Sequence, residues 1–510
     1  MIKKYDVIII GGGATGAGVA VESITRKYKT ILFEEYDFGS GTSSKSTKLV
    51  HGGLRYLANL DFHLIYEGLT ERHYFIKNAP HLAHEQSYLV PFYTWREKLA
   101  YLIAINSYQF LSGCKKIGKI RLLSKQEIIN QVPNIKQKNL IGGAIYYDGQ
   151  FDDTRMLISL IKTFEQKGGH AYNYHKVVDI IKDNNRAIGV KVFNKLTNQE
   201  QIYHAKVIIN ATGAFSDAIL NLDNPQIKHN NIIATQGTHL VFEHQLFPSQ
   251  HAVVIPKTPD GRIIFILPWQ GVSLVGTTDI KLDKPVIEPT ATNDEVNFIL
   301  ETLNQYTNKI ITHKDIKSIF TGIRPLVKTA NAKNNAKISR KHKILYSDSG
   351  IITILGGKWT IYRKMGEDAI NFAIKHNLLL PSRSVTKNTM LVDATHDKLD
   401  YPLSVYGTES IKIITIQTEI NNFDLIHPAL PYYIAEVIYQ VRYEKAITIE
   451  DVLARRTRAL YLNAQAAIES SRLVAEIMAK ELKMNQQWID NQVNSFYQYA
   501  KHYTLCSLSQ

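Results

Sequence analysis

The sequence predicts an α/β fold with a parallel sheet near the N-terminus, an antiparallel sheet in the middle of the chain and helices at the end. Residues 7–10 form the continuous apolar run of a strand that is buried on both faces, and the run ends in glycines. Between residues 232 and 279 short apolar runs alternate with turns, which indicates an antiparallel sheet. Beyond about residue 390 glycine becomes rare and helical patterns dominate. A chain of 510 residues is long enough for two or three such domains.

A glycine-rich turn follows the first strand and has the spacing of a dinucleotide site. Gly11, Gly13 and Gly16 match G-x-G-x-x-G, in which glycines permit a tight turn, close approach to a pyrophosphate and close helix packing. Residues 30–33 then form a second strand that ends in Glu34, about twenty residues past the glycines, where a carboxylate would accept ribose hydroxyl groups. The alternative to this ribose-binding role is that Glu34 is a solvent-exposed residue at the end of a strand. The acid favours an unphosphorylated ribose, so the pattern predicts a Rossmann-like site for FAD or NAD rather than NADP.

Further along the chain, local signals predict the start and end of several helices. Residues 61–79 have a helical pattern that Pro80 ends, and Asp152 and Asp153 start another helix that is closed by a glycine pair at 168–169. Thr292 and Glu295 have the spacing of a capping box. Strand patterns are found at residues 176–181, 187–193, 201–209, 239–242, 252–255, 262–268, 272–276 and 352–355.

Composition limits the class of protein. The net charge of +14 is compatible with a nucleic-acid partner or with an anionic surface, such as a membrane leaflet or a phosphorylated substrate. The two cysteines, Cys114 and Cys506, provide neither a disulfide framework nor a metal-ligand cluster, so we expect a reducing compartment and no metal. The sequence has no run of about eighteen apolar residues, so we expect no membrane-spanning helix.

Several motifs, in order and spacing, resemble the FAD-dependent glycerol-3-phosphate dehydrogenases of aerobic respiration. They are GGGATGAG with the acid-ended second strand, TSSKSTKL at residues 42–49, HGGLRYL at residues 51–57 and EDVLARRTR at residues 450–458. The family belongs to the glycine oxidase and D-amino-acid oxidase type of flavoprotein. The resemblance implies a discontinuous FAD-binding domain, a substrate-binding domain with an antiparallel sheet and a helical C-terminal domain. The corresponding ranges are 1–75, 145–225 and 320–388 for FAD, 76–144 and 226–319 for substrate, and 389–510 for the helical domain.

The resemblance implies FAD in the glycine-rich site, with the isoalloxazine ring reaching toward residues 43–53. A helix N-terminus after the glycine pair at 356–357 would suit charge on a reduced flavin ring. The residues that the resemblance assigns to FAD are Gly11, Gly13, Ala14, Thr15, Gly16, Glu34, Thr42, Ser43, Ser44, Lys48, Leu49, His51, Gly52, Gly53, Val177, Ala211, Thr212, Gly213, Arg324, Gly357, Lys358 and Thr360.

The reaction implied is oxidation of sn-glycerol 3-phosphate to dihydroxyacetone phosphate, with hydride transfer from C2 to the flavin. For the proton of the hydroxyl we expect His239, because an imidazole accepts a proton at neutral pH without a large pKa shift. Arg324 is expected nearby to polarise the C2 oxygen, and which of the two takes the proton stays open. From the residues alone, His239 is a hydrogen-bonded strand histidine. The residues that match the family's phosphate-binding positions are Arg55, Tyr56, Arg340 and Lys358, and guanidinium forks suit phosphate oxygens.

Residues 93–121 place large apolar and aromatic side chains, from Trp95 to Leu111, before a basic cluster that includes Lys116 and Lys119. This pattern favours an interfacial helix on an anionic membrane surface, and a core helix with a basic loop is the alternative. Members of the family are peripheral membrane enzymes that pass electrons to ubiquinone or another membrane quinone. We therefore expect a peripheral enzyme on the cytoplasmic face of the inner membrane, with oxygen as the competing electron acceptor. A homodimer is compatible with this expectation.

Two other functions remain open at this point. An amine oxidase of the same fold would lack the phosphate-binding cations. A basic RNA-modifying flavoprotein would carry a basic stripe with interleaved aromatic residues. The only comparable cluster lies at residues 115–121 beside apolar residues that are better suited to lipid, so we expect no nucleic-acid partner.

Overall fold

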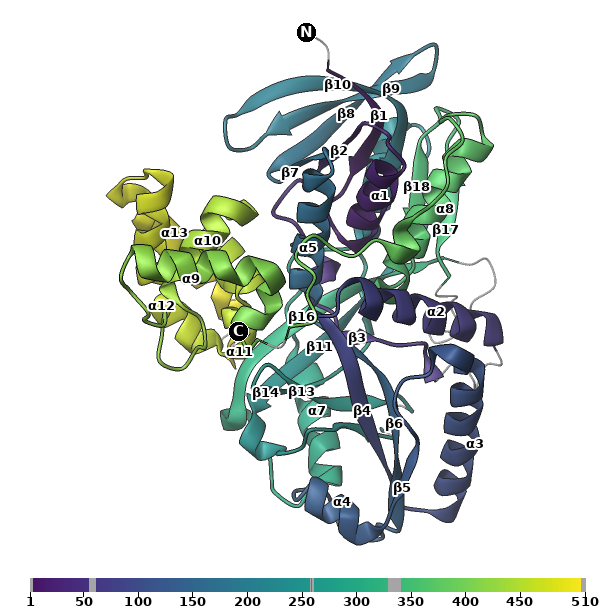
Figure 1. Ribbon diagram of the computed structural model, residues 1–510, viewed down its shortest axis with the longest axis vertical. Helices are drawn as coiled ribbons and strands as arrows, with labels where there is room; N and C mark the ends of the chain where they lie inside the picture. The colour runs from purple at the N-terminus through teal and green to yellow at the C-terminus, as the bar shows by residue number, and fades with distance from the viewer. Residues whose placement is uncertain are drawn as a thin grey trace.

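The computed structural model describes residues 3–54, 61–256, 258, 261–328, 341–397 and 399–505. Figure 1 shows a body built on a first sheet at the top, a body built on a second sheet at the bottom, and C-terminal helices beside both. The predicted α/β class, with its antiparallel sheet and helical C-terminal part, is confirmed.

The first sheet has a parallel centre that carries the glycine loop. Strand β1 runs parallel to β2 on one side and to β10 on the other, and β8 and β9 extend the sheet as antiparallel strands. The strands are β1 (Lys3–Ile10), β2 (Thr30–Phe33), β7 (His170–Tyr172), β8 (His175–Asp183), β9 (Arg186–Asn194), β10 (Gln199–Asn210), β17 (Lys343–Tyr346) and β18 (Ile352–Leu355). Parallel strands that are buried on both faces consist of continuous apolar runs. This explains why the apolar run at residues 7–10 predicted a strand correctly.

Helices cover one face of the first sheet and share its core. Helix α1 packs against both α5 and α8, as seen in Figure 1. Their bounds are α1 (Ala14–Thr25), α5 (Asp153–Gln166) and α8 (Tyr362–Lys375); helix α6 (Ser216–Asp223) lies on the other face, where Ile219 and Leu222 pack against the cluster that contains Val190. The side chain of Asp152 accepts a hydrogen bond from the backbone of Arg155 at 2.9 Å and so caps α5, as the sequence predicted.

The second sheet is mainly antiparallel and is organised around β11. Strand β11 pairs with β14 and, over most of its length, with β16. Its strands are β3 (Leu49–Val50), β4 (Ala83–Phe92), β5 (Arg121–Leu123), β6 (Gly142–Phe151), β11 (Ile232–Glu243), β12 (Ala252–Ile255), β13 (Ile264–Trp269), β14 (Val272–Gly276), β15 (Ile280–Lys281) and β16 (Ile316–Val327). Because β6 and β16 lie in this sheet, both cross the domain boundaries at 145 and 320 that the sequence suggests, and the exact division stays a proposal.

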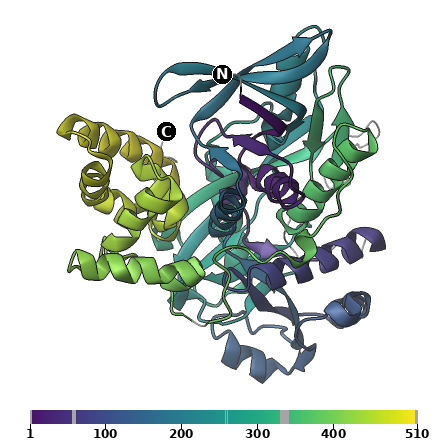
Figure 2. The same ribbon diagram turned by 45° about the horizontal axis from the view of Figure 1, so that its top comes forward.

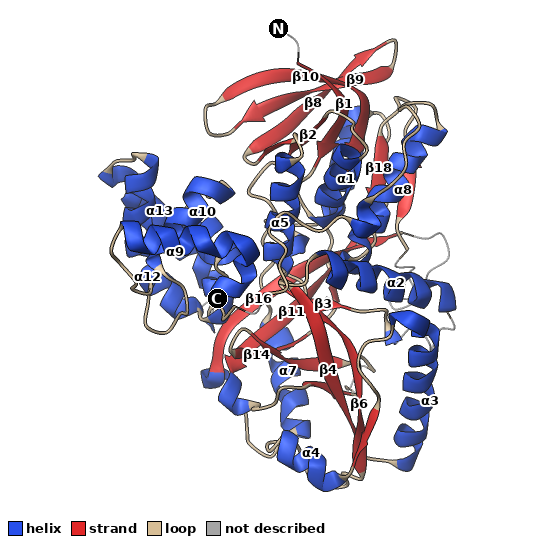
Figure 3. Ribbon diagram, viewed as in Figure 1, coloured by secondary structure: helices blue, strands red, loops and turns tan. Residues whose placement is uncertain are grey.

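Four helices accompany the second sheet, and Figure 3 shows α2 at its upper end, α3 along one side and α4 at its lower end. They are α2 (Phe62–Asn78), α3 (Trp95–Ser112), α4 (Lys125–Gln131) and α7 (Asn293–Tyr306). The side chain of Asp61 caps α2, and Thr292 and Glu295 form the predicted capping box of α7. None of the described helices is long and apolar enough to cross a bilayer.

The C-terminal helices form a separate layer that nevertheless shares a core with the second sheet. Val452 and Leu460 pack in one buried cluster with Trp269 and Phe320. Figure 2, turned from the first view, keeps these helices on one side of both sheets. Their bounds are α9 (Ser410–Glu419), α10 (Ile434–Glu444), α11 (Ala459–Leu462), α12 (Ala464–Leu482) and α13 (Gln486–Ala500), with a π-helical turn at Asp451–Arg456.

Candidate active site

The glycine loop between β1 and α1 is packed too closely for side chains. A Cβ on Gly16 would overlap the carbonyl oxygen of Gly11, and a Cβ on Gly11 would lie 2.7 Å from the carbonyl oxygen of Ala211. Gly11 also has a φ of +107°, a conformation that favours glycine. The first turn of α1 begins directly after Gly13, so its backbone amides face the loop. Thr15 lies in the same turn.

Glu34 lies at the end of β2 and holds the glycine loop in place. The backbone N–H of Gly12 donates to one carboxylate oxygen at 2.6 Å, and that of Tyr36 donates to the other at 3.0 Å. Loss of hydration raises the pKa of the Glu34 carboxyl group. Each carboxylate oxygen keeps a second lone pair for a further donor such as a ribose hydroxyl. A loop without side chains, a helix N-terminus and this acid together fit a dinucleotide.

Residues 211–213 lie against the same loop, and Val177 shares a buried cluster with Ile10 and Phe33, the last residues of β1 and β2. The N–H of Ala211 donates to the carbonyl of Ile10 at 2.8 Å, and the Thr212 hydroxyl donates to Asn210 at 2.7 Å. Gly213 has a φ of +57° and opens the turn that precedes α6. Val177 is buried in β8, in the core on the other face of the first sheet.

The stretch of residues 43–53, which we call segment 43–53, connects the glycine loop to the start of α8. The hydroxyl of Ser43 accepts a hydrogen bond from the N–H of Ala14 at 2.9 Å, and the carbonyl of Ser43 accepts one from the indole of Trp359 at 2.9 Å. The N–H of His51 donates to the Thr360 hydroxyl at 3.4 Å. The remaining predicted residues of this region are Thr42 and Ser44 in a turn, Leu49 in β3, Gly52, Gly53 with a φ of +88°, and Gly357 and Lys358 just before the turn Trp359–Ile361.

His239 lies in the middle of β11, only 2 % exposed, and touches segment 43–53. Its Nε2 is hydrogen-bonded to the hydroxyl of Thr47 at 3.0 Å, and its ring stacks on Phe320 with centroids 4.7 Å apart. Its Nδ1 is buried without a hydrogen-bond partner among the described residues. A buried polar atom without a partner costs free energy, so it indicates a place for a ligand group.

Burial and nearby positive charge keep the imidazole of His239 neutral. Burial, followed by the positive charges of Arg324 and Lys48, lowers the pKa of His239 well below 6.5. At neutral pH the ring is therefore uncharged and has the lone pair that a general base requires.

Arg324 lies on β16, opposite Thr235 of β11, and His239 lies further along β11, opposite Phe320. Its guanidinium group donates to the carbonyl of Gln236 at 3.3 Å and to the hydroxyl of Thr277 at 3.0 Å, and it pairs with Asp279 at 3.2 Å. A Cβ on Gly237 would overlap the guanidinium group. The glycine of Gln236-Gly237-Thr238-His239 therefore provides the space in which Arg324 lies beside β11.

Lys48 supports segment 43–53 from inside the protein. Its ammonium group lies 2.5 Å from Asp153 and donates to the carbonyl of Ser44 at 2.8 Å. Burial, and then the charge of Arg458, lowers the pKa of Lys48 to about 7. Arg458 donates to the same Ser44 carbonyl at 2.6 Å. These contacts hold the segment that leads to Thr47 and His239.

The sequence did not predict three residues of this cluster, Thr47, Asp153 and Arg458. Thr47 lies inside the motif TSSKSTKL, Asp153 begins α5, and Arg458 ends the motif EDVLARRTR. Their positions in or next to recognisable motifs could have marked them as candidate site residues. Their contacts could not be predicted, because their partners lie far away in the sequence. Of the predicted substrate residues, Arg55, Tyr56 and Arg340 lie outside the described residues.

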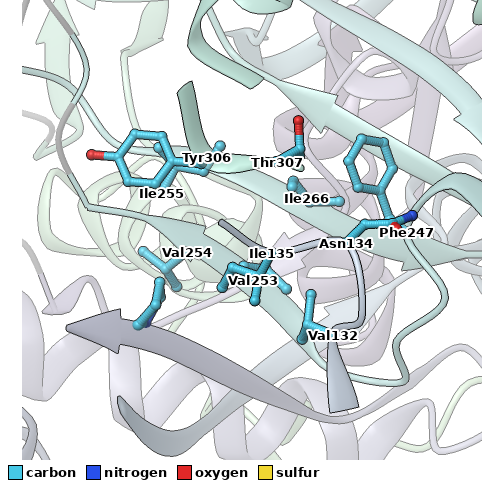
Figure 4. A pocket seen from close by; sticks show the side chains of 11 residues that line it. Val132, Asn134, Ile135, Phe247, Val253, Val254, Ile255, Ile266, Tyr306 and Thr307 are labelled. Carbon is cyan, nitrogen blue, oxygen red and sulfur yellow. The ribbon is translucent and has the colours of Figure 1, made fainter. Parts of the chain in front are cut away.

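An apolar pocket in the second body is distinct from this site. As Figure 4 shows, aliphatic and aromatic side chains such as Val132, Val254, Ile266 and Phe247 line it, with Tyr306 and Thr307 at one side. His239 and Arg324 are not among its lining residues. A pocket with this lining offers few polar groups for orienting a charged substrate.

Comparison with known proteins agrees with this geometry. Residues 6–363 match the model of the FAD-dependent oxidoreductase family, and residues 351–489 match the C-terminal domain of alpha-glycerophosphate oxidase. The probable mitochondrial glycerol-3-phosphate dehydrogenase of Dictyostelium discoideum is 36% identical over 541 residues, which cover 98% of this chain and 84% of that protein. The mitochondrial glycerol-3-phosphate dehydrogenase of Rattus norvegicus is 35% identical over 525 residues, which cover 95% and 71%.

Solved structures extend the comparison. The glycerol-3-phosphate dehydrogenase of Bacillus halodurans, solved in complex with FAD, has a TM-score of 0.80 and 27% identity, with 98% of this chain and 95% of that chain covered. Glycine oxidase of Geobacillus kaustophilus shares the fold, with a TM-score of 0.52 and 17% identity over 78% of this chain. The chain is an oxidoreductase with FAD as its cofactor, and it belongs to the family of FAD-dependent glycerol-3-phosphate dehydrogenases.

Proposed function

We propose that the protein oxidises the C2 hydroxyl of sn-glycerol 3-phosphate to the ketone of dihydroxyacetone phosphate. The observation that carries this proposal is the neutral, buried His239, whose Nδ1 has no hydrogen-bond partner among the described residues and which lies close to Arg324 and in contact with segment 43–53. The site combines a proton acceptor with positive charge, which is what oxidation of a phosphorylated alcohol requires.

The proton of the C2 hydroxyl passes to His239, whose neutral imidazole has the lone pair to accept it. Arg324 polarises the C2 oxygen and stabilises the negative charge that develops on it, since a guanidinium group is always charged. FAD, when bound, supplies the acceptor for the hydride that leaves C2. Thr47 orients the imidazole through its hydrogen bond to Nε2.

Two groups of residues would hold the substrate and the cofactor. The phosphate of the substrate is assigned to Arg55, Tyr56, Arg340 and Lys358, because several cations around one phosphate fix its position. The dinucleotide is assigned to the glycine loop, to Glu34 and to residues 211–213, and the flavin ring to segment 43–53 and the start of α8. Family membership and the close contacts of these segments support this assignment.

We also propose that the electrons pass on to a quinone in a membrane that α3 contacts. One face of α3 is exposed and apolar, with Phe110 86 % and Trp95 72 % exposed and with Leu99 and Ile103 between them. Lys116 and Lys119 are exposed just after this helix. An apolar face beside cations suits the boundary of an anionic bilayer.

The test of this function uses the purified protein with FAD bound, under anaerobic conditions. Addition of glycerol 3-phosphate is expected to bleach the flavin absorbance at about 450 nm. The reduced enzyme is then mixed either with a short-chain ubiquinone or with oxygenated buffer, and the quinone is expected to reoxidise it faster. If glycerol 3-phosphate leaves the flavin oxidised, the proposed substrate is wrong. If oxygen reoxidises the reduced enzyme faster than the quinone does, the electron acceptor is oxygen and not a quinone.

Substitution of His239 tests the proton acceptor in the same assay. His239→Gln is expected to slow flavin reduction by about 10²–10⁴-fold, since this is the usual contribution of a general base. His251→Gln is the matched control, because His251 is a half-buried histidine of the same body that is hydrogen-bonded to Ser87. If the flavin of His239→Gln is reduced at the wild-type rate, a group other than His239 accepts the proton of the C2 hydroxyl.

A further inference from the structure

Tyr108 lies on the inward face of α3 and joins this helix to segment 43–53. The side chain is 3 % exposed, whereas Phe110 on the same helix points outward. The backbone N–H of Gly52 donates to the Tyr108 hydroxyl at 2.8 Å, and that hydroxyl donates to the carboxylate of Asp148 at 2.6 Å. The hydroxyl group thus acts once as acceptor and once as donor, and both bonds are buried.

The partners of Tyr108 are themselves fixed. Asp148 lies in β6 and accepts a hydrogen bond from Arg72 of α2 at 2.9 Å. A Cβ on Gly52 would lie 2.5 Å from the Tyr108 hydroxyl and 2.7 Å from Leu69, so the chain at Gly52 is packed between α2 and α3. Figure 1 shows these two helices beside β6. The backbone of Gly52 therefore has little room to shift while Tyr108 is in place.

The bond to Gly52 is needed because the sheet ends just before it. Strand β3 pairs with β6 only through Leu49 opposite Gln150 and Val50 opposite Gly149. Beyond these two pairs, the N–H of Gly52 has no strand partner in the part of the chain that the structure describes, and a buried N–H without an acceptor is costly. The Tyr108 hydroxyl replaces the missing sheet acceptor.

Segment 43–53 is the part of the chain that touches His239 through Thr47 and the start of α8 through Ser43 and His51. We propose that Tyr108 is a positioning residue for the reaction, which fixes the backbone of Gly52 and with it the end of segment 43–53. Tyr108 acts through Gly52 and does not touch the reacting atoms. This inference rests on the proposed function, in which segment 43–53 borders the flavin ring.

The test is Tyr108→Phe, which removes both hydrogen bonds but keeps the ring. We expect kcat/KM for glycerol 3-phosphate to fall about tenfold, chiefly through the rate of flavin reduction, because catalysis is sensitive to small misplacements. The visible circular dichroism of the bound flavin is expected to change as well. Tyr101→Phe on the same helix is the matched control, since the Tyr101 ring stacks on Phe92 and its hydroxyl makes no hydrogen bond within the described part of the chain.

Asp148→Asn separates positioning from stability. This variant weakens the pairing with Arg72 and is expected to lower Tm, but it leaves the Tyr108 hydroxyl as the acceptor for Gly52, so kcat/KM should stay within threefold of wild type. Equal losses of kcat/KM in Asp148→Asn and Tyr108→Phe would reduce Tyr108 to a structural role and overturn the proposal. Wild-type kcat/KM and flavin dichroism in Tyr108→Phe would overturn it too.

A measurement on the wild-type holoenzyme decides the question if Tyr108→Phe does not fold. Hydrogen exchange of the Gly52 amide is expected to be slow, and exchange at the rate of an exposed amide would overturn the proposal. The two proposals fail in different ways. If glycerol 3-phosphate leaves the wild-type flavin oxidised, the proposed function fails; if it reduces wild type and Tyr108→Phe equally fast, only the role of Tyr108 fails.

Discussion

At the scale of single residues, the charge state of His239 depends on its neighbours. Burial is the largest influence that lowers its pKa, and the cations Arg324 and Lys48 add to it. Both cations disfavour the imidazolium form, so His239 is unprotonated at neutral pH and can accept the proton of the C2 hydroxyl.

The pH dependence of kcat/KM tests this view. In wild type, protonation of His239 is expected to reduce kcat/KM only well below pH 6.5, because the pKa of the free enzyme is lowered. Arg324→Gln removes a neighbouring positive charge, so the protonated form becomes less unfavourable and the pKa rises. The acid limb should therefore move to higher pH in this variant, whatever its absolute rate. Profiles from pH 5 to 9 with a soluble electron acceptor measure the shift, and an unmoved limb would contradict it.

At the scale of elements, α3 has two faces with different partners. Its inward face carries Ile105 and Tyr108, and its outward face carries large apolar side chains from Trp95 to Phe110. A capping box at Thr94 and Glu97 starts the helix, so its boundary is set locally. An exposed apolar face of this kind on a helix that is otherwise anchored favours contact with a membrane surface.

Vesicle binding tests the outward face. The double variant Leu99→Glu/Phe110→Glu is expected to lose binding to vesicles that contain phosphatidylglycerol, because it places charge where an apolar face would enter the lipid boundary. Turnover with a soluble acceptor should stay at the wild-type level. Phe423→Glu is the control, since Phe423 is similarly exposed but lies beyond α9 in the C-terminal part. Equal vesicle binding by all three proteins, measured by sedimentation at low and high salt, would contradict a lipid role for α3.

At the scale of the whole molecule, buried ion pairs join the C-terminal helices to the body of the first sheet. Arg455 and Arg456, from the π-helical turn, both bind the carboxylate of Asp37. Arg155 of α5 forms a two-pronged pair with Glu444 of α10, with both distances 2.7 Å. The motif EDVLARRTR therefore acts as a docking segment between two parts of the chain. Breaking such pairs is costly, because the remaining charge stays buried.

Asp37→Asn is expected to lower the free energy of unfolding by about 3–5 kcal/mol at pH 7, since it removes the carboxylate that pairs with the buried Arg456, whereas Arg455 keeps Glu450 and Asp451. The two arginines lower the pKa of Asp37 to about 2, although burial opposes them. A depressed carboxyl pKa contributes stability that is complete above the unfolded value of about 4 and is lost as pH falls through the folded value. The difference between wild type and Asp37→Asn should therefore shrink below about pH 4.

Thermal unfolding of wild type and Asp37→Asn between pH 2.5 and 7 measures this difference. Asp490→Asn is the control, because it breaks an exposed pair with Arg472 and such pairs contribute about 0–1 kcal/mol. A difference that stays constant at all pH values would show that the Asp37 charge does not stabilise the docking.

Much of the local structure could be read from the chain. The glycine loop, the cap at Asp152 and the capping box at Thr292 and Glu295 were predictable, because each depends on residues a few positions apart. The acid at Glu34 was predictable over a longer distance, 22 residues from Gly12, because it ends the strand that follows the loop and its helix. His239 could be chosen only through the resemblance to a family, since nothing in its own strand distinguishes it from an ordinary buried histidine.

The sequence by itself determined the fold class, because short-range patterns of glycine, charge and apolar residues encode elements and motifs, and through its resemblance to a family it also determined FAD as the cofactor. Only the tertiary structure decided which residues meet: Thr47 with His239, 192 residues apart, Gly52 with Tyr108, 56 residues apart, and Ser44 with Arg458, 414 residues apart. These contacts depend on how sheets and helices pack against one another. Packing is a property of the folded chain as a whole, so no local pattern records it.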